Sequence, residues 1–451
     1  SSSENNSFYN SSISGSSSYG VYVTSSSKNN VFDNNSISSS SSYGMYIGSS
    51  NNRFYNNDIS GGSTSSDYGV YIYNYCDNNS FVNNSISSGS SYGVYMNNYC
   101  DNNSFVNNSI SSGASYAVRA YNYCDNNSFV NNSISSGSSY GVYIYRSSYN
   151  GFYDNSISSG SSYGVYMTTS SDNNRFYNNS ISGDNYGLLV YSSSTGNRFY
   201  NNSISGGSGS SSSYGVYMYA SSDNIFYNNS ISAASVATNS FGVYMYSSTD
   251  NNITYNHIEA GTATNSYGIR IYYDSDNNIV ERNNITSGSS GVRLEESSTY
   301  DPDNNIIRYN RIIDMTKYGI WATNDADGTR IYGNTIGDPV CGINITSADN
   351  TIIANNTIVN NTWGICAHTS QDVLIRNNSI YNNTMDGIFF DNSDSGGVYN
   401  NTINDTDRYG VYLDAGSTDN RFWDNSIRGG FGADDRGVFI YSSSNNDFYN
   451  S

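Results

Sequence analysis

The sequence contains little of what most enzymes use for chemistry. Its 451 residues include only two histidines, His257 and His368, and only two prolines, Pro302 and Pro339. The histidines lie far apart along the predicted fold, which excludes a multi-histidine metal site and weakens any acid–base mechanism built on histidine. Both prolines stand in turn-like stretches, as expected of a chain rich in β-ladders, because proline cannot donate a ladder hydrogen bond.

Charge and long apolar runs are also scarce. Charged residues make up 12% of the chain, and the formal net charge is −19. An acidic chain repels phosphate groups, so neither nucleic acid nor an anionic membrane surface is an expected partner. No apolar run approaches the ~18 residues of a membrane span, so no membrane insertion is expected. Cations or neutral glycans suit this surface better.

What the sequence has in abundance is repetition. A unit of 22–27 residues recurs eighteen times, and a typical copy, residues 78–96, reads NNSFVNNSISSGSSYGVYM. A fixed period in this range predicts a solenoid, in which no unit can bury its apolar face without neighbours. Every copy carries one isoleucine at the same place. These are Ile13, Ile37, Ile59, Ile86, Ile110, Ile134, Ile157, Ile181, Ile204, Ile231, Ile258, Ile285, Ile312, Ile336, Ile358, Ile380, Ile403 and Ile427.

Around each isoleucine the apolar residues follow the pattern of β-strands. A phenylalanine stands five residues earlier in most copies, as Phe105 does before Ile110. Two further apolar residues follow the glycine of each copy, for example Val94 and Met96 on either side of Tyr95. This period of two is typical of a strand with one buried face.

Short strands separated by Ser/Asn/Gly turns predict an all-β chain. We expect one domain over residues 1–451, a right-handed parallel β-helix of about 18 coils of 22–27 residues, since parallel crossovers favour that hand. Residues 1–250 are rich in Ser and Tyr and have an inner Phe column. Residues 251–451 are richer in Ile and Val and diverge more from the repeat.

Asparagine occupies a column two residues before the isoleucine. Its amide both donates and accepts, so stacked copies are expected to form a structural side-chain ladder. Asparagine also tolerates the left-handed backbone of a sharp turn. A glycine column, with Ala117 as its only exception, indicates either positive φ or close backbone packing. The first members of the ladder are Asn35, Asn57, Asn84, Asn108, Asn132, Asn155, Asn179 and Asn202.

Many asparagines also begin Asn-x-Ser/Thr triplets, the acceptor motif of N-glycosylation. Each triplet is a weak motif, and a chain rich in Asn and Ser produces many by chance. Ten of them nevertheless share one column, three residues before the isoleucine, and would form a row of glycans if that column faces outward. These candidates are Asn34, Asn83, Asn107, Asn131, Asn178, Asn201, Asn228, Asn355, Asn377 and Asn400.

Tyrosines alternate with the apolar pairs and should face outward. Their flat rings could bind sugar rings or pack against another molecule, and they could equally stack on one another as cross-strand aromatic pairs. The row consists of Tyr22, Tyr46, Tyr71, Tyr95, Tyr143, Tyr166, Tyr217, Tyr244 and Tyr412.

Three cysteines, Cys76, Cys100 and Cys124, share the sequence YNYCDNN at a spacing of 24 and should lie above one another. One disulfide, a column of buried thiols and a site for a soft metal all remain open. Cys341 and Cys366 occupy different positions of the repeat, which makes a disulfide between them doubtful.

Aspartates recur in the turns that carry these cysteines and in equivalent turns. Stacked carboxylates repel one another, so these positions are either solvated or neutralised by Ca²⁺, the only cofactor we consider. They are Asp77, Asp101, Asp125, Asp172, Asp223 and Asp250.

The order Gly-aliphatic-x-aliphatic, Asn-Asn-x-aliphatic, Asn-x-Ile resembles the right-handed parallel β-helix repeats of NosD-like proteins. Residues 343–358 (INITSADNTIIANNTI) and 365–380 show it well, and the resemblance extends over essentially the whole chain. It implies a repeat architecture of the kind found in microbial surface proteins, particularly archaeal ones, and in polysaccharide lyases, glycosidases and epimerases. NosD itself is linked to the maturation of a copper site, but nothing in this chain reproduces a copper-ligand cluster.

The sequence favours an extracellular structural glycoprotein at the cell surface, such as a fibre subunit or a component of a sheath or surface layer. We therefore expect no enzymatic activity and assign no catalytic, cofactor-binding or metal-ligating residue. Both ends, NNSFYN and NNDFYNS, show the same phase of the repeat without a polar cap. Either the chain is a fragment or copies of it stack head to tail.

Two other functions remain open. One is a non-catalytic adhesin that binds glycans. The other is a polysaccharide lyase, hydrolase or epimerase, which we favour less because the paired-Asp and Gly-His-Gly motifs of polygalacturonase-like enzymes are absent. Asp301-Pro302-Asp303 is similar to the Asp-Pro-His stretch of alginate epimerases but lacks the histidine.

Overall fold

The computed structural model describes residues 3–64, 66–207, 211–234, 238–296, 301–429 and 435–451. Its regular structure consists of parallel β-strands, and these ranges contain no helix. None of the described segments is therefore a helix long and apolar enough to cross a membrane.

Three strands make up a typical coil. In one coil they are β13 (Ser104–Val106), β14 (Ser109–Ser112) and β15 (Tyr116–Tyr121). Each pairs in parallel with the equivalent strand of the next coil, so that Ile110 lies beside Ile134 and Ile134 beside Ile157. Like residues therefore stack on like residues, and the predicted parallel β-helix of about 18 coils is confirmed.

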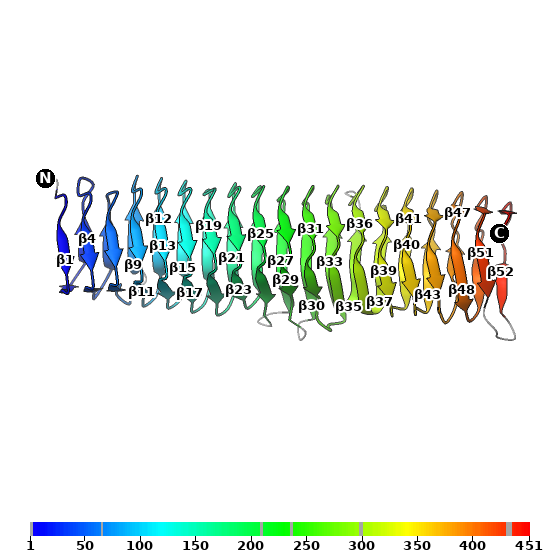
Figure 1. The fold of residues 1–451 in the computed structure, drawn as a ribbon, viewed down its shortest axis with the longest axis horizontal. Coiled ribbons are helices and arrows are strands. Elements are labelled where there is room, and N and C mark those ends of the chain that lie inside the picture. Colours follow the sequence, from blue (N-terminus) through cyan, green and yellow to red (C-terminus); the bar gives the residue numbers. More distant parts are fainter. Residues whose placement is uncertain (1–2, 65, 208–210, 235–237, 297–300, 430–434) are drawn as a thin grey trace. The chain divides into compact units, whose positions relative to one another are not determined.

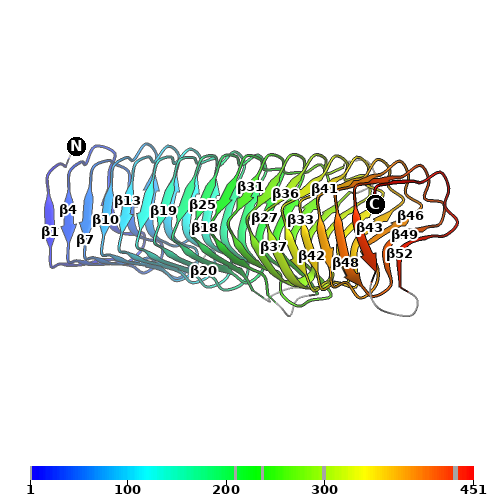
Figure 2. The same ribbon diagram turned by 45° about the vertical axis from the view of Figure 1, so that its right-hand side comes forward.

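The chain divides into two compact units, residues 1–225 and 226–451. In unit 1 the short strands such as β13 form one sheet, in which β10 (Ser80–Val82) and β16 (Ser128–Val130) flank β13 (Figures 1 and 2). The other two strands of each coil belong to a second sheet. Its long strands are β3 (Tyr19–Val23), β6 (Tyr43–Ile47), β9 (Tyr68–Tyr73), β12 (Tyr92–Asn97), β15, β18 (Tyr140–Tyr145), β21 (Tyr163–Thr168), β24 (Tyr186–Tyr191) and β27 (Ser212–Tyr219).

Unit 2 has the same coil with longer strands in its first half. In β35 (Asn284–Glu295) and β37 (Arg311–Thr323) one continuous strand covers the positions of two strands in other coils. The remaining long strands are β33 (Asn265–Tyr272), β40 (Cys341–Thr346), β43 (Trp363–His368), β46 (Ile388–Asp391), β49 (Tyr409–Asp414) and β52 (Arg436–Ile440).

The core of unit 1 is a continuous stack of phenylalanine rings beside the isoleucine column. Phe81, Phe105 and Phe129 are fully buried, and the centres of neighbouring rings lie 4.7 Å apart. Burial of each such side chain stabilises the fold by ~1.5–3 kcal/mol. In unit 2 aliphatic residues such as Ile331 and Ile353 take the place of the rings.

The glycine column is explained by close packing and not by positive φ. A Cβ added to Gly93 would lie 2.6 Å from the carbonyl oxygen of Ala117 and 2.8 Å from Cγ2 of Ile110. Backbone and isoleucine of the next coil therefore occupy the space that a side chain would need.

Buried asparagines form a ladder in each unit. In unit 1 the Nδ2 of Asn84 donates to Oδ1 of Asn108 over 3.0 Å, and Nδ2 of Asn108 donates to Oδ1 of Asn132 over 3.0 Å. The backbone N–H of Asn84 also donates to Oδ1 of Asn108 (2.9 Å). A second ladder, through Asn79, Asn103 and other residues of the preceding turn, was not predicted from the sequence. These amides satisfy the polar groups of buried turns.

The left-handed turn residue is the asparagine before the ladder, not the ladder asparagine itself. Asn83 and Asn107 have φ angles of 57° and 56°. The position with left-handed backbone therefore coincides with the column of glycosylation candidates.

Candidate functional site

Tyrosine rings cover the outward side of the long strands of unit 1. They stand in columns at the start, middle and end of each strand, because residues of equal register lie on neighbouring strands. Their rings stack on one another: Tyr92 and Tyr116 are 5.1 Å apart, and Tyr116 and Tyr140 are 4.7 Å apart. We call this surface the tyrosine face. It comprises Tyr19, Tyr22, Tyr43, Tyr46, Tyr68, Tyr71, Tyr73, Tyr92, Tyr95, Tyr116, Tyr121, Tyr140, Tyr143, Tyr145, Tyr163, Tyr166, Tyr186 and Tyr191.

Three phenol groups of this face illustrate how burial keeps a tyrosine neutral at physiological pH. Burial raises the pKa of Tyr46, Tyr68 and Tyr140 to about 12. Each hydroxyl therefore keeps its proton and can both donate and accept a hydrogen bond. The result is a surface of stacked tyrosine rings and their hydroxyl groups, and no Asp or Glu stands in the tyrosine columns of unit 1.

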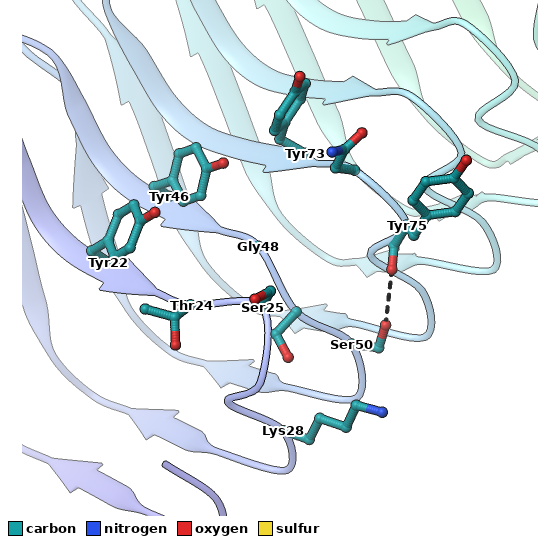
Figure 3. Close-up of a pocket in the computed structure, with 11 residues that line it drawn as sticks. Tyr22, Thr24, Ser25, Lys28, Tyr46, Gly48, Ser50, Tyr73 and Tyr75 are labelled. Atoms are coloured by element: carbon teal, nitrogen blue, oxygen red, sulfur yellow. Dashed lines mark hydrogen bonds between the residues drawn. The ribbon is translucent and has the colours of Figure 1, made fainter. Parts of the chain in front are cut away.

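A groove opens where the first coils of the tyrosine face meet their turns. Figure 3 shows Tyr22 and Tyr46 side by side on neighbouring strands, with Tyr75 on a turn across from them. The groove has a volume of about 690 Å³, and Tyr22 and Tyr75 are 52% and 66% exposed. Lys28 and small hydroxyl residues such as Ser50, whose Oγ donates to the carbonyl of Tyr75 over 3.3 Å, complete the wall.

One arginine interrupts the tyrosine columns. Arg119 in β15 lies in register with Tyr95 and Tyr143 and takes the place of a tyrosine. Its guanidinium carbon is 4.3 Å from the ring centre of Tyr121 and 4.8 Å from that of Tyr95, and Nη1 donates to the hydroxyl of Tyr92 over 3.0 Å. The sequence analysis missed this residue, although the replacement of the repeated tyrosine by arginine is visible in the sequence.

The corresponding face of unit 2 is built from ion pairs. Arg270 in β33 and Arg293 in β35 both contact Glu295, with nitrogen–oxygen distances of 2.9 and 2.7 Å. Arg293 also lies over the ring of Trp321, 4.1 Å from its centre. These arginines are therefore neutralised by a protein carboxylate.

The turn aspartates of unit 1 hold the next coil. Oδ1 of Asp77 accepts from the backbone N–H of Asp101 over 2.9 Å, and Oδ1 of Asp101 accepts from that of Asp125 over 2.8 Å. Burial raises the pKa of Asp101 and Asp125. These hydrogen bonds partly compensate the repulsion between stacked carboxylates, and Ca²⁺ at this column stays a prediction.

Within the described residues, one group of three carboxylates lies close enough to share a cation. Glu296, Asp301 and Asp325 of unit 2 have carboxylate oxygens within 4.8 Å of one another. The sequence analysis did not single out this group as a metal site.

All five cysteines are free and buried. Cys76, Cys100 and Cys124 are in the core of unit 1, and burial raises the pKa of Cys124. In unit 2, Nδ1 of His368 lies 3.3 Å from a carboxylate oxygen of Asp391. A hydrogen bond from the protonated imidazole to Cys366 and the nearby Asp391 raise the pKa of His368, while His257 is in another coil, beside Asn284.

The glycosylation candidates are exposed in the structure, and their φ angles are positive. Successive coils are ~4.8 Å apart, which is too close for a glycan on every neighbouring candidate. Any glycosylation is therefore expected to be partial. The exposed positions are Asn34, Asn83, Asn107, Asn131, Asn178, Asn201, Asn228, Asn355, Asn377 and Asn400.

Comparison with known proteins identifies the architecture. The family model of the right-handed β-helix region matches residues 1–122, 63–204, 115–231, 204–336 and 323–451, which together span the chain. This match covers the β-helix repeat as a whole and is broader than the resemblance to NosD-like proteins. No curated protein sequence matches the chain.

Solved structures similar to this chain have low identity to it. The periplasmic alginate epimerase AlgG shares 16% identity over 66% of this chain and 77% of its own, with a TM-score of 0.42. The Dettilon tailspike protein shares 16% over 77% and 62%, with a TM-score of 0.45. An alginate lyase from a Paenibacillus species shares 13% over 71% and 99%, with a TM-score of 0.34.

These comparisons correct the function expected from the sequence. Carbohydrate-processing enzymes recur among the similar structures, which contradicts the prediction of a structural fibre protein without enzymatic activity. Repeat regularity and uncapped ends were its basis, and both features are compatible with other roles of the fold. At these identities each likeness is to the fold alone, and the family match rests on the repeat itself. The chain belongs to the right-handed β-helix family.

Proposed function

We propose that this chain is a carbohydrate-active protein that acts outside the cytoplasm and binds a polysaccharide along the tyrosine face of unit 1. The observation that carries the proposal is the set of stacked tyrosine columns beside an open groove lined by Tyr22, Tyr46, Tyr73 and Tyr75. Binding of the polysaccharide is the first step of any action on it.

The chemistry of the surface matches that of a sugar chain. The faces of sugar rings carry C–H groups that pack on aromatic rings, and large aromatic surfaces supply most of the apolar contact area at binding sites. The hydroxyls of Thr24, Ser25 and Ser50 in the same groove can bond to sugar hydroxyls.

The repeat of the fold matches the repeat of a polymer. Neighbouring coils place equivalent tyrosines ~4.8 Å apart, close to the length of one sugar residue. A glycan that runs across the strands therefore meets an equivalent ring at each step. Stacking among the tyrosines holds the rings in place, so little conformational entropy is lost on binding.

Binding of neutral oligosaccharides tests the proposal. We expect a hexasaccharide of glucose or mannose to bind the full chain in isothermal titration calorimetry. Replacement of two groove residues, Tyr22→Ala with Tyr75→Ala, should weaken the affinity at least tenfold. Tyr149→Ala is the control, because Tyr149 is 56% exposed in unit 1 and does not line this groove. Equal loss in the control, or no binding of any oligosaccharide by the parent, would refute the proposal.

We further propose that the exposed acceptor asparagines are glycosylated in part when the source cell has the enzymes. The support is their exposure and turn conformation. Mass spectrometry of tryptic peptides from natively expressed protein measures the occupancy. Asn83 and Asn107 are adjacent candidates on one tryptic peptide, between Arg53 and Arg119, and modification of both on the same peptide would contradict the crowding argument.

A further inference from the structure

The coil of Arg119 departs from the repeat at several neighbouring positions. Ala117 replaces the glycine of the column, Arg119 replaces the outward tyrosine, and Ala120 replaces a larger inward residue such as Met96 or Ile144. The coils on either side keep the usual residues. A cation has thus been placed in the middle of an aromatic surface.

This cation has aromatic neighbours but no acid. The guanidinium carbon lies within 5.5 Å of the ring centres of Tyr92, Tyr95, Tyr116, Tyr121 and Tyr143. In the described part of the chain, no carboxylate oxygen forms an ion pair with it, whereas Arg270, Arg293, Arg308 and Arg408 each pair with Asp or Glu. Among the described residues, only Nη1 of its three nitrogens has a hydrogen-bond partner.

The hydrogen-bonding capacity of Arg119 is largely unused. Its Nε is enclosed without a partner, and no group of the residues that the structure describes accepts from Nη2. A guanidinium offers a planar fork of N–H groups that matches carboxylate and sulfate oxygens. Tyrosine rings around the fork lower the local dielectric and strengthen a contact with an anion. The arginines on the corresponding face of unit 2, Arg270 and Arg293, differ because they form ion pairs with Glu295 within the protein.

We propose that Arg119 and the tyrosines around it form an anion subsite of the tyrosine face, which binds a carboxylate or sulfate group on an otherwise neutral stretch of glycan. The inference rests on the proposed function and adds the class of sugar. A single cation fits an occasional acidic residue in the glycan. The net charge of −19 disfavours a densely charged polymer.

The surroundings of the subsite agree with this ligand. Residues 1–225 contain six Lys or Arg and eleven Asp or Glu, so most of the excess of acid belongs to residues 226–451. The outward positions of the strands on either side, β12 and β18, carry no Asp or Glu. An anionic group at Arg119 therefore meets tyrosine hydroxyls and not carboxylates.

Three probes on the full chain test the subsite. They are a neutral oligosaccharide that carries a single galacturonate residue, its methyl-esterified form, which has the same backbone without charge, and a neutral galactan oligosaccharide that carries a single sulfate group. We expect one or both acidic probes to bind at least tenfold more tightly than the ester, with an advantage that declines as salt rises from 50 to 500 mM. Comparison of the two acidic probes shows whether the subsite prefers a carboxylate or a sulfate group.

Arg119→Tyr is the decisive variant, because it restores the residue of the column and removes the charge. It should abolish the preference for the acidic probes and leave the affinity for the ester within about twofold. Arg175→Gln is the control, since Arg175 is an exposed arginine of unit 1 on the short-strand sheet, in β22 (Arg175–Tyr177).

The outcomes separate the two proposals. Equal affinity of the parent for acidic and esterified probes, or an acidic preference that survives Arg119→Tyr, overturns the anion subsite. Binding of neutral oligosaccharides that depends on Tyr22 and Tyr75 would keep the proposed function in either case. If no glycan binds, the function and the subsite are both refuted.

Discussion

The two units share one coil but differ in what they place on its outer surface. In unit 1 the long strands carry stacked tyrosines and a single unpaired arginine, Arg119. Unit 2 has arginines paired with acids, such as Arg293 with Glu295, together with Trp321. Both units have asparagine ladders and a buried inner column, which is mostly Phe in unit 1 and mostly Ile or Val in unit 2. The comparison teaches that the β-helix separates the residues that build the fold from those that face a ligand.

The largest expected effect concerns the part that the units share. Asn108→Ala in unit 1 removes hydrogen bonds to Asn84, Asn132 and the carbonyl of Phe81. We expect the free energy of unfolding to fall by roughly 4–6 kcal/mol, because about four bonds are lost and buried partners remain unsatisfied. Urea denaturation followed by circular dichroism measures this change.

The matched variants sharpen this result. Asn356→Ala removes the same kind of ladder bonds from unit 2 and should have a similar effect. Asn107→Gly changes the exposed residue before Asn108. The φ of 56° at Asn107 suits glycine, so this variant should have little effect on stability. A much smaller loss in unit 2 would show that the ladders are not equivalent.

The second effect should occur only in unit 2. Arg408→Ala leaves the carboxylate of Asp386, which is fully buried, without the Nε–H donor 2.8 Å away. We expect a loss of about 3–4 kcal/mol at pH 7, measured by urea denaturation. Arg330→Ala, which removes an exposed arginine of the same unit, serves as control. An equal loss in both variants would contradict a specific role of the buried pair.

The third effect is a pH dependence in the acidic turns of unit 2. Burial, followed by the charges of Asp276, Asp327 and Asp301, raises the pKa of Asp303 to about 6 from 3.8. Between these values the folded state binds more protons than the unfolded state, so this group makes stability fall as pH rises from about 4 to about 6.

Asp303→Asn removes this titration and keeps an oxygen for the backbone N–H of Asp327. The melting temperature at pH 7 should rise by roughly a few degrees relative to the parent, and the gain should disappear at pH 4. Differential scanning calorimetry at the two pH values measures it. A gain of equal size at both would exclude charge repulsion as the cause.

The smallest effect returns to the outer surface of unit 1. Because Arg119 makes only one hydrogen bond to the protein, Arg119→Tyr should change the free energy of unfolding by less than about 1 kcal/mol. Thermal unfolding of the variant that is used for the binding test measures this directly. A loss above 2 kcal/mol would mean that the cation supports the fold, and a structural role would then explain its presence.

The sequence predicted the parts of the fold that repeat. The stacking of Ile110 on Ile134 and the inner phenylalanines followed from period alone, because a buried column must present the same residue type in every coil. The backbone conformation of the individual turn residues was harder to predict from the sequence. Asn107 and Asn108 are chemically identical, and only the backbone decides which one is left-handed and which one is buried.

The candidate site was only partly accessible from sequence. The middle tyrosine column, with Tyr95 and Tyr143, was recognised from alternation. The columns through Tyr116 and Tyr121 were not, because they lie at strand ends where alternation is short. Arg119 was overlooked because a search for repetition favours residues that agree, whereas a binding group in a repetitive chain is one that differs.

The asparagine ladders have a further consequence, since the hydrogen bonds from one ladder amide to the next run in one direction. From Asn84 to Asn108 to Asn132, and in unit 2 from Asn334 to Asn356, each amide donates to the coil that follows. Amide dipoles aligned in this way add up and polarise one another. Each stack is thus electrically directional, and an inserted coil would preserve this polarity only if it carried its asparagines in the same orientation.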